Sequence, residues 1–265
     1  MYDFAYQKPT SVGDAVRLVS ADPDARPLAG GQTLIPVLKQ RLNKPTVLVD
    51  LSKLGLAGIK ASGNALTIGA MTTHYTVFTS PEVKRALPAL ASLAGLIGDP
   101  AVRHRGTIGG SLANNDPTAD YPAAVLALGA TIKTERRSIP ADDFFQGMFT
   151  TALQAGELIT AVEFPVRVEK AGYEKFRNPA SRYAMVGVFV ARGPAGVRVA
   201  VTGAGQNGVF RQKEMEAALA NSWSPDAIAN IKTPADGLNS DIHGSAEYRA
   251  HLITVIAKRA VAAAG

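Results

Sequence analysis

The chain has 265 residues, of which 46% are hydrophobic and 19% are charged, so it can bury a core and is not a disordered tail protein. It contains no cysteine, which excludes disulfides, iron–sulfur ligation by this chain, thiolate zinc sites and a cysteine nucleophile. The net charge is +6, but the basic residues are scattered, so we rank nucleic-acid binding well below the binding of a small anion or a protein.

The beginning of the chain lacks a basic stretch followed by an apolar one, as a signal peptide would have. No apolar run reaches the roughly 20 residues that a transmembrane helix needs. We therefore expect a soluble, cytoplasmic protein with no membrane span.

The first part of the chain alternates helix and strand patterns. The first predicted helix, residues 11–21, begins with Ser11 and Asp14 in the spacing of a capping box. Further predicted helices cover residues 33–42, 81–97 and 121–129. The predicted strands cover residues 27–29, 46–51, 130–134 and 157–164, with a hairpin over 57–70 that turns at 62–64. Residues 99–118, rich in Gly, Asn, Asp and Pro, are predicted to form a loop.

The composition shifts near residues 165–172. The predicted elements that follow are strands over 173–177, 183–191 and 197–202, then helices over 211–221, 225–231 and 246–264. Three strands followed by helices are typical of an α+β unit with an antiparallel sheet. We therefore predict an α+β chain of two domains, residues 1–167 and 168–265.

Two glycine-rich segments of the first domain could bind an anion. Gly30 and Gly31 lie between a strand and a helix, where the backbone can approach a ligand and the N–H groups of Gln32 and Thr33 are free. Residues 106–111 (GTIGGS) repeat this pattern with two hydroxyls and two upstream arginines. Each segment alone is more often an ordinary connection or surface loop. Together they suggest a ligand with two linked phosphates, such as a dinucleotide.

A rival site is the literal G-x-G-x-x-G of Gly203–Gly208, which follows a predicted strand and precedes a predicted helix. A nicotinamide-binding unit also needs a second parallel strand that ends in an acidic residue about 20 residues further on. No β-branched run follows here, and Asp226 belongs to the first turn of a predicted helix. An NAD-binding dehydrogenase that uses Gly203–Gly208 therefore remains the alternative interpretation.

The sequence contains no P-loop lysine and no nucleophile elbow. The four histidines, His74, His104, His243 and His251, have no metal-ligand spacing, and we expect each to be a surface or hydrogen-bonded histidine. We predict neither a metal site nor a catalytic residue on this chain.

The two glycine segments, Leu28–Pro36 and Val102–Ser111, resemble the two FAD motifs of the flavin-binding medium subunit of molybdenum hydroxylases, the carbon monoxide dehydrogenase and xanthine dehydrogenase family. The resemblance extends over essentially the whole chain and includes Gly69–Thr73, Asn178–Ala184 and Glu247–Arg249. It implies an FAD-binding fold of the vanillyl-alcohol oxidase and p-cresol methylhydroxylase type, followed by the family's α+β C-terminal flavoprotein domain.

The resemblance also implies which residues contact FAD. Ala29 to Thr33 and Thr107 to Ser111 would hold the pyrophosphate, Asp120 would lie near the ribityl or flavin end, and Tyr183 would lie against the isoalloxazine ring. The full set of implied contacts is Leu28, Ala29, Gly30, Gly31, Gln32, Thr33, Leu34, Thr107, Ile108, Gly109, Gly110, Ser111, Asp120 and Tyr183. The chain departs from many relatives at His104 and Ser111, where asparagine is common.

The implied function is electron transfer within a larger enzyme. A large subunit would oxidise the substrate at a molybdenum cofactor, and a small subunit would relay electrons through iron–sulfur clusters. This chain would pass the electrons through FAD to an outside acceptor. The implied assembly is a dimer of heterotrimers, in which this chain does not oxidise substrate by itself.

Overall fold

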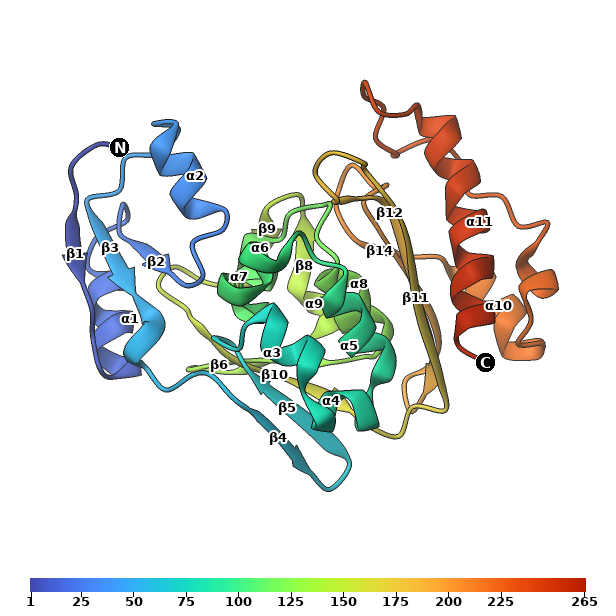
Figure 1. The fold of residues 1–265 in the computed structure, drawn as a ribbon, viewed down its shortest axis with the longest axis horizontal. Coiled ribbons are helices and arrows are strands. Elements are labelled where there is room, and N and C mark those ends of the chain that lie inside the picture. Colours follow the sequence, from blue (N-terminus) through green and yellow to red (C-terminus); the bar gives the residue numbers. More distant parts are fainter.

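The computed structural model describes all 265 residues, which form three units in a row along the longest axis of the molecule (Figure 1). We name them the N-terminal unit (residues 1–56), the central unit (57–167) and the C-terminal unit (168–265). No helix is long and apolar enough to cross a membrane.

The N-terminal unit is a small parallel sheet in the order β1-β3-β2. Its elements are β1 (Ala5–Gln7), α1 (Val12–Ser20), β2 (Arg26–Leu28), α2 (Leu34–Lys39), β3 (Val47–Asp50) and the 3₁₀ turn η1 (Leu51–Lys53). Helix α1 begins as predicted, because the Ser11 hydroxyl accepts a hydrogen bond from the Asp14 N–H at 3.1 Å. Helix α2 ends three residues earlier than predicted, since Arg41 adopts a left-handed φ of 58°.

The central unit is an antiparallel sheet in the order β4-β5-β10-β6-β7, covered by helices (Figure 1). Its strands are β4 (Ile59–Ser62), β5 (Ala65–Gly69), β6 (Thr131–Thr134), β7 (Ser138–Pro140) and β10 (Ile159–Pro165), with a small pair β8 (Phe145–Gly147) and β9 (Thr150–Thr151). Its helices are α3 (His74–Thr79), α4 (Pro81–Ala86), α5 (Pro88–Gly95), α6 (Pro100–Arg105), α7 (Ile108–Asn114), α8 (Tyr121–Ala127) and α9 (Ala141–Phe144). The predicted hairpin is present, and Gly63 turns it with a φ of 56°.

Two predictions for the central unit are wrong. The single helix over 81–97 is two helices, because Pro88 forces Leu87 out of the helical conformation and starts α5. The loop over 99–118 contains α6 and α7. Asp99 caps α6 by accepting from the Val102 N–H at 2.9 Å, and Pro100 occupies its first position.

The C-terminal unit is the predicted antiparallel sheet, in the order β11-β12-β13-β14, with helices on its outer face. Its elements are β11 (Lys170–Arg177), β12 (Ala184–Gly193), β13 (Gly196–Thr202), β14 (Phe210–Arg211), α10 (Lys213–Asn221), η2 (Pro225–Ile228) and α11 (Ala246–Ala263). The helix predicted over 225–231 is only the 3₁₀ turn η2, which Ser224 caps at the Ala227 N–H.

The two faces of the C-terminal sheet belong to different hydrophobic cores. Val188 and Val190 of β12 pack in a core with α10 and α11. The alternate residues Phe189 and Ala191 belong to the core of the central unit, and α8 packs on β12 and β13. The central and C-terminal units therefore share one continuous core.

Candidate functional site

A cavity of about 610 Å³ is walled by all three units, which is within the range of about 300–1,000 Å³ that small-molecule sites occupy. Eleven of the fourteen residues predicted to contact a cofactor line it: Ala29, Gly30, Gly31, Gln32, Thr33, Leu34, Gly109, Gly110, Ser111, Asp120 and Tyr183. The other three, Leu28, Thr107 and Ile108, do not line the cavity, although each is a sequence neighbour of a residue that does. Segments that are distant in the sequence thus meet at one cavity.

The connection between β2 and α2 carries a run of free backbone donors. The N–H groups from Gly30 to Leu34 donate no hydrogen bond within the chain, although these residues line the cavity. Gly31 has a left-handed φ of 73°, which glycine adopts without strain. Consecutive N–H groups without acceptors at the N-terminus of a helix favour an anionic ligand.

The two glycine segments are in direct backbone contact. A Cβ atom on Gly30 would lie 2.1 Å from the carbonyl oxygen of Arg105, so no other residue fits there without moving the backbone. Gly110 lies on the same seam, where a Cβ would come within 3.5 Å of the Ala29 side chain. This contact places α7 beside the free N–H groups.

The second segment contributes to the wall in a different way from the first. The N–H groups of Ile108 and Gly109 donate to the carbonyl oxygens of Thr72 and Ala70, at 3.1 and 2.9 Å. The Thr107 hydroxyl caps α7 by accepting from the Gly110 N–H at 3.1 Å. The backbone donors here are therefore largely used within the protein, and the segment presents Gly110 and Ser111 to the cavity.

Asp120 is held at one end of the cavity by residues of the C-terminal unit. Its carboxylate pairs with the Lys175 ammonium at 3.0 Å and accepts a hydrogen bond from the Tyr173 hydroxyl, and all three side chains are buried. Burial raises the pKa of Asp120, although Lys175 and Tyr173 act in the opposite direction. Lys175 was missed from sequence, since it lies 55 residues away in a strand that gives no local sign of this contact.

Tyr183 lies at the same end, on the turn between β11 and β12. Its side chain is 50% exposed, and it lines the cavity together with Asp116 and Asp120. Burial, followed by the charges of Asp116 and Asp120, raises the pKa of Tyr183. The turn is fixed by Asn178, whose side-chain oxygen accepts from the N–H groups of Ala180 and Ser181. A fixed turn keeps the half-exposed ring at the cavity.

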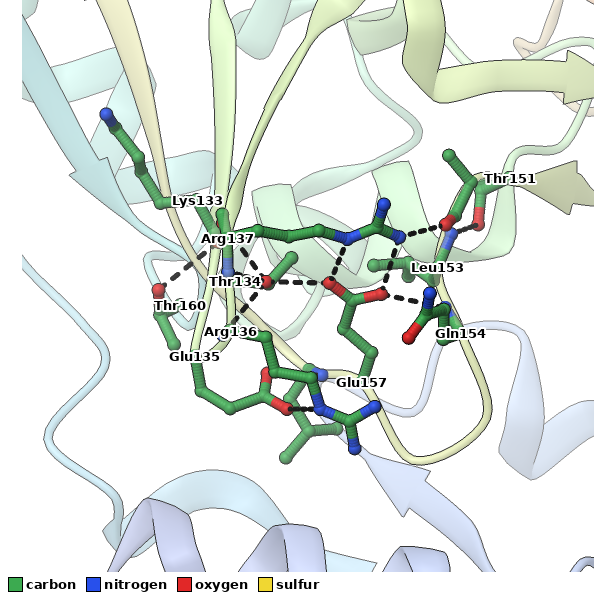
Figure 2. A network of polar contacts seen from close by, with 12 residues as sticks. Lys133, Thr134, Glu135, Arg136, Arg137, Thr151, Leu153, Gln154, Glu157 and Thr160 are labelled. Atoms are coloured by element: carbon green, nitrogen blue, oxygen red, sulfur yellow. Dashed lines mark hydrogen bonds and ion pairs between the residues drawn. The ribbon is translucent and has the colours of Figure 1, made fainter.

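Glu157, which sequence reasoning also missed, lines the cavity next to Leu158, and Leu158 packs in the core of the N-terminal unit. Its side chain is sealed from solvent, and its carboxylate accepts two hydrogen bonds from Arg137, each of 2.9 Å (Figure 2). The Thr134 hydroxyl and the Gln154 N–H donate to the same carboxylate. This network ties the β6–β7 turn to the segment between β9 and β10, which forms the wall.

His74 does not follow the expectation for a surface or hydrogen-bonded histidine. It is buried, it lines the cavity, and its ring forms no hydrogen bond. Burial, with a contribution from the charge of Arg103, lowers the pKa of His74 to about 4. The ring is therefore neutral at pH 7.

The rival loop Gly203–Gly208 lies outside this cavity and borders a smaller one of about 330 Å³. Its N–H groups are largely used in packing, since those of Gly203, Gln206 and Gly208 donate to Pro117, Gly237 and Gly205. The element after the loop is the edge strand β14, which is antiparallel to β13, not the parallel strand of a nicotinamide-binding unit. The loop therefore lacks the geometry of a phosphate cradle.

Fold and cavity together define an α+β chain built around a large cavity that is lined by free backbone N–H groups. Residues 2–167 match the family model described as the FAD binding domain in molybdopterin dehydrogenase. The nicotine 6-hydroxylase medium subunit of Paenarthrobacter nicotinovorans is 39% identical, over 98% of this chain and 96% of that protein. The carbon monoxide dehydrogenase medium chain of Afipia carboxidovorans is 35% identical, over 97% and 95%.

The fold agrees with solved structures of the same kind. A carbon monoxide dehydrogenase chain from Hydrogenophaga pseudoflava superposes with a TM-score of 0.88 at 34% identity, over 99% of this chain and 97% of that one. The chain belongs to the family of FAD-binding medium subunits of molybdenum hydroxylases, and it is an oxidoreductase subunit with FAD as its cofactor. Neither the family model nor these relatives support the NAD-binding alternative.

Proposed function

We propose that this chain is the electron-transfer subunit of a molybdenum hydroxylase, with FAD bound in the large cavity. The observation that carries the proposal is the run of free N–H groups from Gly30 to Leu34 in the cavity wall, beside Gly110 of α7. When bound, FAD supplies the capacity to take up electrons from one partner and release them to another. The residues of this chain bind and orient it.

The cavity suits an elongated ligand with its phosphates in the middle. The amides of Gly30 to Leu34 would hold the pyrophosphate, and Gly110 leaves room for it to approach. At one end, Asp120 and Tyr183 would contact the ribityl chain and the flavin ring. At the other end, apolar side chains such as Leu158 leave a place for the adenosine half.

The remaining features of the proposal concern fold type and partners. We assign residues 1–167 to an FAD-binding domain of the p-cresol methylhydroxylase type and 168–265 to the family's C-terminal flavoprotein domain. Electrons would reach this chain from an iron–sulfur small subunit and originate at a molybdenum-containing large subunit, in a dimer of heterotrimers. The names of the relatives, medium subunit and medium chain, support the presence of further subunits.

An absorption spectrum of the purified chain, followed by mass spectrometry of the released cofactor, tests the cofactor assignment. We expect a flavin spectrum and the mass of FAD. Native mass spectrometry of the endogenous complex tests the assembly, for which we expect two further subunits. A homogeneous species that contains only this chain and oxidises the substrate at full rate would refute the subunit assignment.

A further inference from the structure

The histidine at the start of α3 is built into the wall of the cavity. Thr73 caps the helix by accepting from the Thr76 N–H, and the backbone N–H of His74 donates to the Gly106 carbonyl at 2.9 Å. The side chain is 5% exposed and lies among the cavity-lining residues. Main-chain bonds therefore fix the ring at the seam beside the second glycine segment.

The two edges of the ring have different surroundings. Nδ1 is sealed inside the protein without a partner, and the Tyr121 ring lies on the inner side at 5.3 Å between ring centroids. The Nε2 edge lies against Gly106, where a Cβ would come within 2.5 Å of Nε2. Gly106 also lines the cavity, and Nε2, unlike Nδ1, is not among the polar atoms sealed inside the protein without a partner. The absence of a side chain at Gly106 is what leaves the Nε2 edge beside the cavity.

Because Nδ1 is sealed inside the protein, only the Nε2 edge of the ring can reach a ligand in the cavity. The one charge that acts on His74 is that of Arg103 on α6, whose guanidinium donates to the carbonyl oxygens of Ile97 and Gly98. Arg103 therefore supplies no hydrogen bond to the ring. A neutral imidazole offers one donor or one acceptor at Nε2, which suits an uncharged hydroxyl or carbonyl group more than a phosphate.

We propose that His74 is a cofactor-binding residue whose Nε2 forms a hydrogen bond with a hydroxyl group of the ribityl chain of FAD. This inference rests on the proposed function. His74 lines the cavity with the residues assigned to the pyrophosphate, such as Gly110, and with those assigned to the flavin end, such as Asp120. The ribityl chain is the part of FAD that joins these two ends and carries hydroxyl groups.

The test uses the full-length chain, freed of FAD, and three variants that separate the two ring nitrogens. His74→Gln places an amide nitrogen close to the position of Nε2, whereas His74→Asn places one close to Nδ1, and His74→Leu removes both. His251→Leu is the control, because His251 is exposed on α11 and is not part of the cavity wall. Dissociation constants are measured by flavin fluorescence for FAD and for analogues that lack the 2′, 3′ or 4′ hydroxyl of the ribityl chain.

We expect His74→Leu and His74→Asn to bind FAD about fivefold to tenfold more weakly, which is the effect of one lost neutral hydrogen bond. His74→Gln and His251→Leu should remain within about twofold of the unmodified chain. One deoxy analogue should bind the unmodified chain more weakly by the same factor and should show no further loss with His74→Leu.

The inference is overturned if His74→Leu binds FAD like the unmodified chain, or if every deoxy analogue loses affinity equally in both. If His74→Leu fails to fold, as judged by circular dichroism, the comparison of His74→Gln with His74→Asn decides the matter, and equal affinities would overturn the inference. Failure of the unmodified chain to bind any FAD would instead refute the proposed function, so the two failures are distinguishable.

Discussion

Replacing Glu157 with glutamine should destabilise the cavity wall, and the loss should depend on pH. The pKa of Glu157 is lowered from 4.5 to about 2, chiefly by its hydrogen bonds from Arg137. Burial acts in the opposite direction, while the hydrogen bonds from the Gln154 N–H and the Thr134 hydroxyl lower the pKa further. At about 1.4 kcal/mol per pKa unit, this shift corresponds to about 3 kcal/mol of stability. Because the Arg137 side chain is 41% exposed and partly screened by solvent, we expect about 2 kcal/mol.

The sign of the pH dependence follows from the lowered pKa. The unfolded carboxyl group titrates near 4.5 and the folded one near 2, so the stabilisation is complete above pH 4.5 and disappears as the pH falls toward 2. Urea unfolding of the FAD-free chain should therefore show Glu157→Gln about 2 kcal/mol less stable at pH 7 than the unmodified chain. The difference should shrink steadily between pH 4.5 and 2.

A matched control is Glu163→Gln on β10. Glu163 pairs with Lys133 at 3.5 Å, but both side chains are more than one-third exposed, so we expect a change of at most about 0.5 kcal/mol. Two results would show that the network in Figure 2 does not stabilise the wall in this way. One is a free energy of unfolding of Glu157→Gln within about 0.5 kcal/mol of the unmodified chain at pH 7. The other is a difference in the free energy of unfolding that is the same at pH 7 and pH 3.

Three further substitutions test the cavity. Gly31→Val should empty the flavin site, because valine is strained at a φ of 73° and its side chain would meet Ile35. Gly55→Val is the control for backbone strain, since Gly55 has a φ of 69° with open space around it. Equal FAD content in the two variants would contradict the prediction. Gly205→Ala should lower the melting temperature, since its Cβ would lie 2.6 Å from the Gly208 carbonyl oxygen, but the folded fraction should keep its FAD. Selective loss of FAD from the folded protein would favour cofactor binding by the loop Gly203–Gly208. Tyr183→Ala should change the flavin spectrum, the reduction potential and the rate with acceptors while FAD binding is largely kept, and three unchanged values would remove Tyr183 from the site.

Local sequence signals predicted the elements that local contacts determine. The Ser11 cap, the hairpin turn at Gly63 and the long strand β12 all follow from short-range patterns. Helix α6 was missed because Asp99 and Pro100 are typical of loops as well as of helix starts, and α7 was missed because glycine disfavours helices. Gly109 is nevertheless helical, because it packs against Ala70, where a Cβ would come within 2.6 Å. Tertiary packing overrides propensity there.

The same division holds for the candidate site. The free amides at Gly30 and Gly31 could be anticipated, since a strand, two glycines and a helix follow one another directly in the sequence. Lys175, Glu157 and His74 could not be anticipated. Lys175 pairs with a carboxylate 55 residues away, and Glu157 accepts hydrogen bonds from a different turn of the chain. His74 is notable because its buried Nδ1 has no partner at all. None of these leaves a periodic or spaced pattern in the sequence.

The shared core has a practical consequence for how this chain can be divided. The family model ends at residue 167, but Phe189 and Ala191 beyond that border complete the core of the central unit. A fragment that stops at 167 would leave the apolar side of α8 bare, and fragment 168–265 would leave one side of its sheet bare. We expect each fragment to aggregate when produced alone, and the two to recombine into a noncovalent, FAD-binding whole when produced together. The end of the family model at residue 167 is thus not a boundary between independently folding units.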